Sequence, residues 1–211
     1  MIKKLACKSG SKKISKEVFD REFKYMISDI EELVEEACKK DANIFGYGSW
    51  SHHIVGVVKY AKLLARKLGA DEEIIELAAL LHDYASVLDK NLYPDHHIHG
   101  ARLAEEILKP YNYSQEKIEK IKDCIFTHRA SKDIIYKSVE ARIIASADAM
   151  AHFDNVNSLL YLAFVKHEME IDEGTNWVLE KLKRSWEKLM PEAREMMRKR
   201  YAAIKIILDK G

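Results

Sequence analysis

The chain places titratable side chains at positions where its sequence otherwise favours buried apolar residues. His82 and Asp83 come directly after residues 74–81, which form the most apolar helix-like segment of the chain. Asp148 likewise interrupts a helical stretch of small and apolar residues. Burying an imidazole or a carboxylate without a partner costs several kcal/mol, so these three side chains need partners.

His53 is a fourth side chain of this kind, because Val57 and Ala61 follow it at +4 and +8 and place its imidazole in line with the buried stripe of a helix. One divalent metal ion would satisfy all four groups, since neutral imidazoles and carboxylates are ligands for borderline and hard cations. A water in an open coordination position would have a lowered pKa and supply hydroxide near neutral pH. The expected metal ligands are His53, His82, Asp83 and Asp148.

The order of these residues resembles the HD superfamily of metal-dependent phosphohydrolases. The resemblance is carried by His53, then by His82-Asp83 after an apolar helix, and then by Asp148 within Ser146-Ala147-Asp148-Ala149, and it covers about residues 51–155. It implies an all-helical fold in which the four ligands converge from separate helices, and hydrolysis of a phosphate ester or anhydride, commonly in a nucleotide. It also implies a catalytic role for Asp83, and it leaves open whether the enzyme is a phosphatase, a pyrophosphatase or a phosphodiesterase.

Some HD subfamilies use further histidines to bind a second metal ion or the scissile phosphate, and His96 and His128 fit that pattern. The segment 95–100 also contains His97 and His99 as alternatives. We prefer His96 because the family pattern places the histidine four residues before the glycine. With both histidines the site would be dinuclear, with ions about 3.5–4 Å apart, bridged by the HD aspartate, and iron or manganese would be favoured. With one ion, the two histidines would serve the phosphate or the leaving group instead.

Three cations adjacent to these positions are candidates for binding substrate phosphate, namely Lys90, Arg129 and Lys132. His152 and His167 are expected to be ordinary structural residues. The sequence does not distinguish manganese, iron, cobalt, nickel, zinc and magnesium as the metal. The residues after the HD pair, Tyr84-Ala85-Ser86, lack the acidic pair that alarmone hydrolases carry there, which argues against that activity.

Composition limits the partners. The formal net charge of +1 over 211 residues provides no general positive field for a long nucleic acid, so a small phosphorylated substrate is expected, which includes nucleotides. The three cysteines form no paired motif, and no apolar run approaches the roughly 20 residues that cross a bilayer. We therefore expect a cytoplasmic protein that does not enter a membrane.

The spacing of apolar residues predicts an all-α fold, in the form of an HD-domain helical bundle. We expect one compact domain over residues 1–211, with a metal-binding core at about 51–155 and with an N-terminal helix at about 16–40 and C-terminal helices at about 156–208 packed on it. Gly69 is expected to end the second helix, and Asp71 and Ser114 to begin later ones. Helices are predicted at 54–68, 71–81, 100–108, 114–128, 138–151, 156–170 and 175–208, where Pro191 leaves one or two helices equally open.

Three interpretations of function compete. The first is the metal-dependent phosphohydrolase. The second is a nucleotide-sensing module that keeps the metal but does not hydrolyse its ligand, and the third is a structural metalloprotein. The amphipathic segment 177–201 could form a homodimer surface, although packing within the core is the preferred interpretation.

Overall fold

The computed structural model describes residues 16–129 and 135–208, and in these ranges every regular element is helical, which confirms the all-α prediction. The α-helices are α1 (Lys16–Lys39), α2 (Val55–Leu68), α3 (Glu72–Leu81), α4 (Tyr84–Leu88), α5 (His96–Leu108), α6 (Gln115–Thr127), α7 (Val139–Asp154), α8 (Val156–Tyr161), α9 (Ile171–Lys188) and α10 (Pro191–Leu208). Two π-helical turns span Trp50–Ile54 and Leu162–Lys166, and two 3-10 turns span Lys90–Asp95 and Lys109–Tyr111.

The helix boundaries follow local chemistry at most of the predicted positions. Gly69 ends α2 in the left-handed conformation, with φ of 68°, and the Asp71 carboxylate accepts hydrogen bonds from the first backbone N–H groups of α3. Pro191 begins α10, where its missing N–H is not needed, so the C-terminal stretch forms two helices. Ser114 is the N-cap of α6, as predicted, but its side chain makes no capping hydrogen bond and only its backbone carbonyl takes part, accepting from Ile118 N.

Three predicted helices differ in extent from the structure, and one of them, α9, begins at Ile171 rather than near residue 175. Helix α5 begins at His96 rather than near residue 100, because the preceding 3-10 turn leads directly into it. The stretch 156–170 is not one amphipathic helix. After α8 the backbone widens into the π-helical turn, in which His167 N bonds to Leu162 O, and it then breaks at Glu168, which has φ of 53°.

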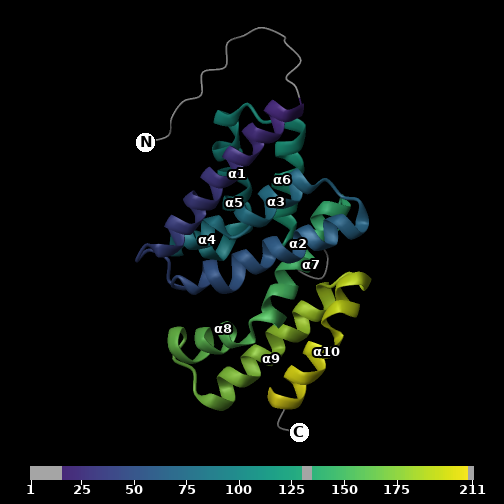
Figure 1. Cartoon of the computed structure of the whole chain (residues 1–211). Coiled ribbons are helices and arrows are strands. Elements are labelled where there is room, and N and C mark those ends of the chain that lie inside the picture. Colours follow the sequence, from purple (N-terminus) through teal and green to yellow (C-terminus); the bar gives the residue numbers. More distant parts are fainter. Residues whose placement is uncertain (1–15, 130–134, 209–211) are drawn as a thin grey trace.

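Helix α7 is central to the architecture. It lies between the group formed by α1 to α6 and the C-terminal helices α8 to α10, which pack at its other end (Figure 1). Its approach to α2 is close, because a Cβ added at Gly56 would lie 3.4 Å from the Ala151 Cβ, in ordinary van der Waals contact. Most of its side chains are therefore buried, and Asp148 is enclosed among them.

An aromatic cluster attaches the C-terminal helices to α7. Trp186 of α9 stacks on Tyr201 of α10 at a centroid distance of 4.6 Å, and Phe153 of α7 meets both rings edge-on. Met190 and Met197 are buried beside this cluster. The amphipathic C-terminal segment thus packs within the chain, as preferred from the sequence. In the described ranges, no helix has the length and apolar composition needed to cross a membrane.

Candidate metal centre

Six predicted ligands come together from separate elements of the helical bundle. The Trp50–Ile54 turn carries His53, the end of α3 carries His82, and the link to α4 carries Asp83. The remaining three are His96 at the start of α5, His128 directly after α6, and Asp148 in α7. The helical scaffold thus brings together side chains that are up to 95 positions apart in the sequence, from 53 to 148.

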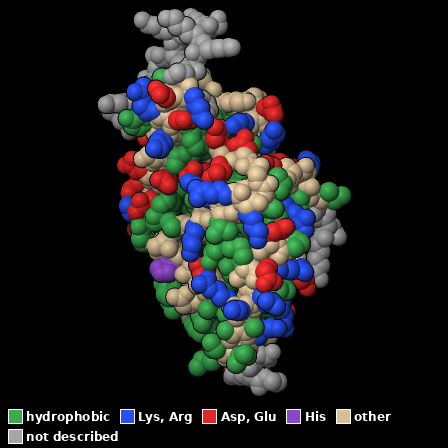
Figure 2. Space-filling view, turned by 45° about the vertical axis from the view of Figure 1, so that its right-hand side comes forward, with side chains coloured by type: hydrophobic (Ala, Val, Ile, Leu, Met, Phe, Trp, Pro, Cys, Tyr) green, Lys and Arg blue, Asp and Glu red, His purple; other side chains and the backbone are tan. Residues whose placement is uncertain are grey.

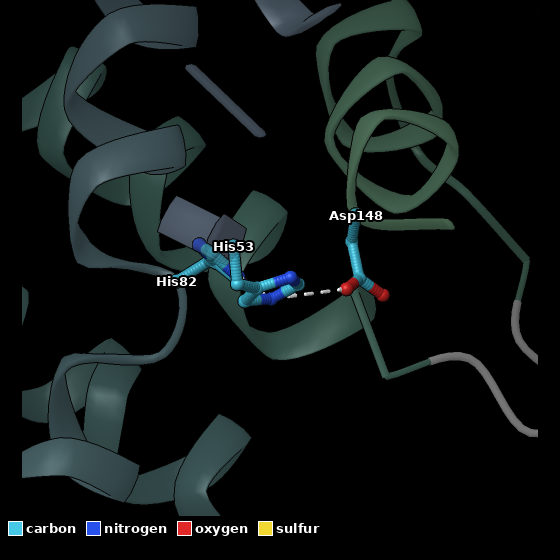
Figure 3. Close-up of side chains that lie close together, drawn as sticks. All are labelled: His53, His82 and Asp148. Atoms are coloured by element: carbon cyan, nitrogen blue, oxygen red, sulfur yellow. Dashed lines mark hydrogen bonds and ion pairs between the residues drawn. The ribbon is translucent and has the colours of Figure 1, made fainter. Parts of the chain in front are cut away.

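The first group of ligands is His53, His82 and Asp148, whose ligand atoms lie within 4.8 Å of one another. The Nε2 atoms of His53 and His82 are 3.2 Å apart, and His53 Nε2 lies 3.5 Å from Asp148 Oδ1. The three side chains point toward a common position from different helices (Figure 3). Three of the four side chains predicted to bind one ion thus lie together, and the fourth, Asp83, lies 3.4 Å from His53 Nε2 through its Oδ2.

The second group is Asp83, His96 and His128, and its ligand atoms also lie within 4.8 Å of one another. The Nε2 atoms of His96 and His128 are 3.2 Å apart and lie 3.3 and 3.6 Å from Asp83 Oδ1. Asp83 Oδ2 faces the first group, at 3.4 Å from His53 Nε2 and 3.5 Å from His82 Nε2. Asp83 therefore offers one carboxylate oxygen to each group.

The hydrogen bonds of three histidines show that these groups fit cations. The Nδ1 atoms of His82, His96 and His128 donate to the backbone carbonyls of Ala79, Tyr93 and Ile125, at 2.7, 2.7 and 2.5 Å. A carbonyl oxygen can only accept, so the neutral rings carry their hydrogen on Nδ1 and a lone pair on Nε2. In the His96–His128 pair, two lone pairs then face each other at 3.2 Å with no hydrogen between them, and a cation resolves that contact.

Burial keeps the imidazoles of His82 and His96 neutral and so available as ligands. It lowers the pKa of the fully buried His82 to about 4, and it also lowers the pKa of His96. The carboxylates behave in the opposite way. Burial alone would raise the pKa of Asp83, but the surrounding imidazoles, that of His82 first, hold it well below its ordinary value. The site thus presents lone pairs and negative charge together, which is the donor set of a divalent metal ion.

Asp148 has further partners that the sequence did not reveal. Lys188 of α9 donates to its Oδ2 at 2.7 Å, and His152 Nε2 lies 3.4 Å from its Oδ1. Burial would raise the pKa of Asp148, but Lys188 first and His152 next hold it well below its ordinary value. The His152 ring also stacks on His53 at 4.7 Å. The expectation that His152 is only an ordinary structural residue overlooked its position four residues after Asp148, which puts both on one face of α7.

The other predicted contributors lie in different places. His97 and His99 belong to neither group, and the structure places His96 there instead. Arg129 lines the cavity beside the metal groups and donates to the Pro94 carbonyl, whereas Lys90 is exposed and lies outside the cavity wall. Lys132 lies outside the described residues.

The two groups border a cavity of about 730 Å³. Its wall includes the loop 45–49 with the nearby Tyr93 ring, Arg129, the side chains of the metal groups other than His82, and side chains of α4, α8 and α9. Phe45 and Tyr93 meet edge-on at a centroid distance of 5.1 Å on the side of the loop. A cavity of this size accommodates a molecule as large as a typical cofactor or drug, next to the candidate metal groups.

Comparison with known proteins agrees with this geometry. Residues 50–152 match the HD domain family. An 82-residue segment is 38% identical to an uncharacterized protein of Clostridium beijerinckii, covering 38% of this chain and 52% of that protein. A 125-residue segment is 28% identical to ribonuclease Y of Fusobacterium nucleatum, covering 59% and 23% of the two chains.

A shorter segment of 39 residues is 51% identical to a symmetrical bis(5'-nucleosyl)-tetraphosphatase of Halalkalibacterium halodurans, covering 18% of this chain and 21% of that protein. The matches thus span about half or less of the length of these relatives. No solved structure matches the chain. Through residues 50–152, the chain belongs to the HD superfamily, a family of metal-dependent phosphohydrolases.

Proposed function

We propose that this chain hydrolyses a phosphate ester or anhydride of a small metabolite or nucleotide at a centre of two divalent ions. One ion would be held by His53, His82, Asp83 and Asp148, and the other by Asp83, His96 and His128. The observation that carries the proposal is the position of Asp83, whose two oxygens each face a separate pair of imidazole Nε2 atoms. A purely structural ion would need only one such group.

The chain's own residues hold the ligands in place before any ion binds. The backbone carbonyls that accept from His82, His96 and His128 fix both the tautomer and the orientation of each ring. Lys188 and His152 fix the Asp148 carboxylate in the same way. Bound divalent ions would supply Lewis acidity and a water of lowered pKa. Asp83 is the residue on which both ion positions depend, which is why we assign it the catalytic role.

The cavity favours a small phosphorylated substrate. At one side of the metal groups, the aromatic rings of Phe45 and Tyr93 offer apolar surface for an organic group, and Arg129 supplies positive charge at the wall. Acidic and basic side chains are interspersed on the face shown in Figure 2, which gives a long polyanion no continuous basic track there. The names of two relatives, ribonuclease Y and the bis(5'-nucleosyl)-tetraphosphatase, support phosphodiester or phosphoanhydride chemistry on nucleotides.

The test is Asp83→Asn, which keeps the shape of the side chain but removes its charge. Elemental analysis would measure bound metal, and a panel of monoesters, diesters and nucleotides would measure turnover with manganese, iron, cobalt, nickel, zinc and magnesium. We expect the wild type to release product and the variant to lose at least about 100-fold in activity, since changes merely to the partners of metal ligands already cost 10–100-fold. Asp20→Asn, on the exposed side of α1, is the matched control and should be unaffected.

The outcomes separate the competing functions. A metal-loaded wild type that hydrolyses no member of the panel but binds a nucleotide would support the sensing module. A wild type that binds metal, neither hydrolyses nor binds any member, and loses stability in Asp83→Asn would support the structural metalloprotein.

A further inference from the structure

Helix α9 contributes a basic wall to the cavity, although it lies outside residues 50–152 that match the family. Its cavity-lining side chains include Lys181, Arg184 and Lys188, at intervals of three and four residues. This spacing places the three cations on one face of the helix. The wall therefore comes from a part of the chain that the shared HD domain does not provide.

The three cations differ in their partners. Lys188 is engaged, because its ammonium donates to Asp148. For Lys181 and Arg184, no carboxylate of the described residues lies within the 4.0 Å of an ion pair. Lys183 on another side of the same helix does pair, with Glu180 at 2.7 Å, and it is not part of the cavity wall. The two cations without a carboxylate partner are thus the ones that face the cavity.

Lys181 is the more enclosed of the two. Burial lowers the pKa of its ammonium, and the charges of Asp148 and Asp83 oppose that effect. Those two carboxylates are also the predicted ligands of the metal ions, so bound ions would neutralise the negative charge that now favours the ammonium. An enclosed cation in that situation is stabilised by an anion brought in from outside. In a cavity next to a phosphohydrolase centre, the matching anion is a phosphoryl group.

We propose that Lys181 and Arg184 form a subsite for a second phosphoryl group, next to the one held at the metal groups. The site would then prefer compounds with two or more linked phosphoryl groups over compounds with one. This inference rests on the proposed function, because it takes the metal groups as the position of the first phosphoryl group. It assigns a specificity role to α9 and involves binding only, with no additional chemical step.

The test measures binding by calorimetry with manganese-loaded protein and two probes, orthophosphate and the non-hydrolysable imidodiphosphate. We expect the wild type to bind imidodiphosphate more tightly. Lys181→Met and Arg184→Ala should each weaken the binding of imidodiphosphate by about 10-fold, which is the effect of losing one hydrogen bond to a charged group. The affinity for orthophosphate should change less than about 3-fold. Lys183→Met removes the same charge from the same helix and should change neither constant.

Folding and rescue are checked in the same series. Circular dichroism should show an unchanged helix content for Lys181→Met, whose side chain is similar in length, and Lys181→Arg should recover most of the affinity for imidodiphosphate. If the variants lose affinity for both probes equally, or lose none for imidodiphosphate, the proposed subsite is refuted. If the variants lose affinity for imidodiphosphate only, but the wild type hydrolyses no phosphoester, the subsite is supported and the proposed enzymatic function is refuted. If the wild type hydrolyses phosphoesters, but the variants do not discriminate between the two probes, the enzymatic function is supported and the subsite is refuted.

Discussion

The neutral state of His82 has a measurable consequence for stability. Its pKa is about 4 in the fold, against an ordinary value of 6.5, because its ring is fully buried. In the unfolded chain the His82 imidazole therefore binds a proton below about pH 6.5, whereas in the folded chain it does so only below about pH 4. The contribution of the neutral His82 ring to the free energy of unfolding is complete above the unfolded pKa and is lost as the pH falls from about 6.5 to about 4. Between about pH 7 and pH 5 the loss amounts to about 2 kcal/mol for this one residue.

Urea unfolding of the chelator-treated protein at these two pH values measures the effect. The wild type should lose more free energy of unfolding between pH 7 and pH 5 than His82→Gln, by about 2 kcal/mol, because glutamine does not titrate. His167→Gln, at an exposed position, should behave like the wild type. An equal loss in the wild type and in His82→Gln would refute the reasoning that burial keeps this nitrogen free for a metal ion.

Three further predictions follow from other side-chain contacts in the structure. Lys188→Met should lower the free energy of unfolding of the metal-free protein by about 3 kcal/mol, since it removes the closest cationic partner of the buried Asp148 carboxylate. The loss should be smaller once manganese compensates Asp148, as urea titration with and without the metal would show. Phe153→Ala should destabilise the chain by about 3–5 kcal/mol in the same assay, because this ring joins α7 to α9 and α10. Asn43→Ala should raise KM several-fold with little change in kcat in steady-state kinetics, because the Asn43 amide donates to Gly46 O and Ser49 Oγ and so holds the loop of the cavity wall.

Local signals were sufficient to predict much of the fold and to single out His82 and Asp83 as candidate ligands. The Asp71 cap and the Gly69 stop are set by residues next to the helix they bound, so they can be read from the sequence. His82 and Asp83 stand out because an apolar helix leads directly to them, and the structure brings both beside His53 and Asp148. Their metal-binding role remains a prediction.

Other features depend on contacts between distant segments and gave no local signal. Lys188 reaches Asp148 across 40 positions of sequence, and nothing near either residue indicates the pairing. Local sequence likewise did not indicate that α5 begins at His96 or that a π-helical turn follows α8, because the surrounding packing decides where a helix begins or widens. The predicted phosphate-binding role of Lys90 rested only on its nearness in sequence to the candidate histidines, and the structure places this lysine on the surface.

Anomalous X-ray diffraction from crystals of the manganese-loaded protein would test the metal centre most directly. A dinuclear centre predicts two peaks about 3.5–4 Å apart on either side of the Asp83 carboxylate, one near His53, His82 and Asp148 and one near His96 and His128. Fully loaded crystals with no peak within coordination distance of the His82 and Asp83 side chains would contradict it.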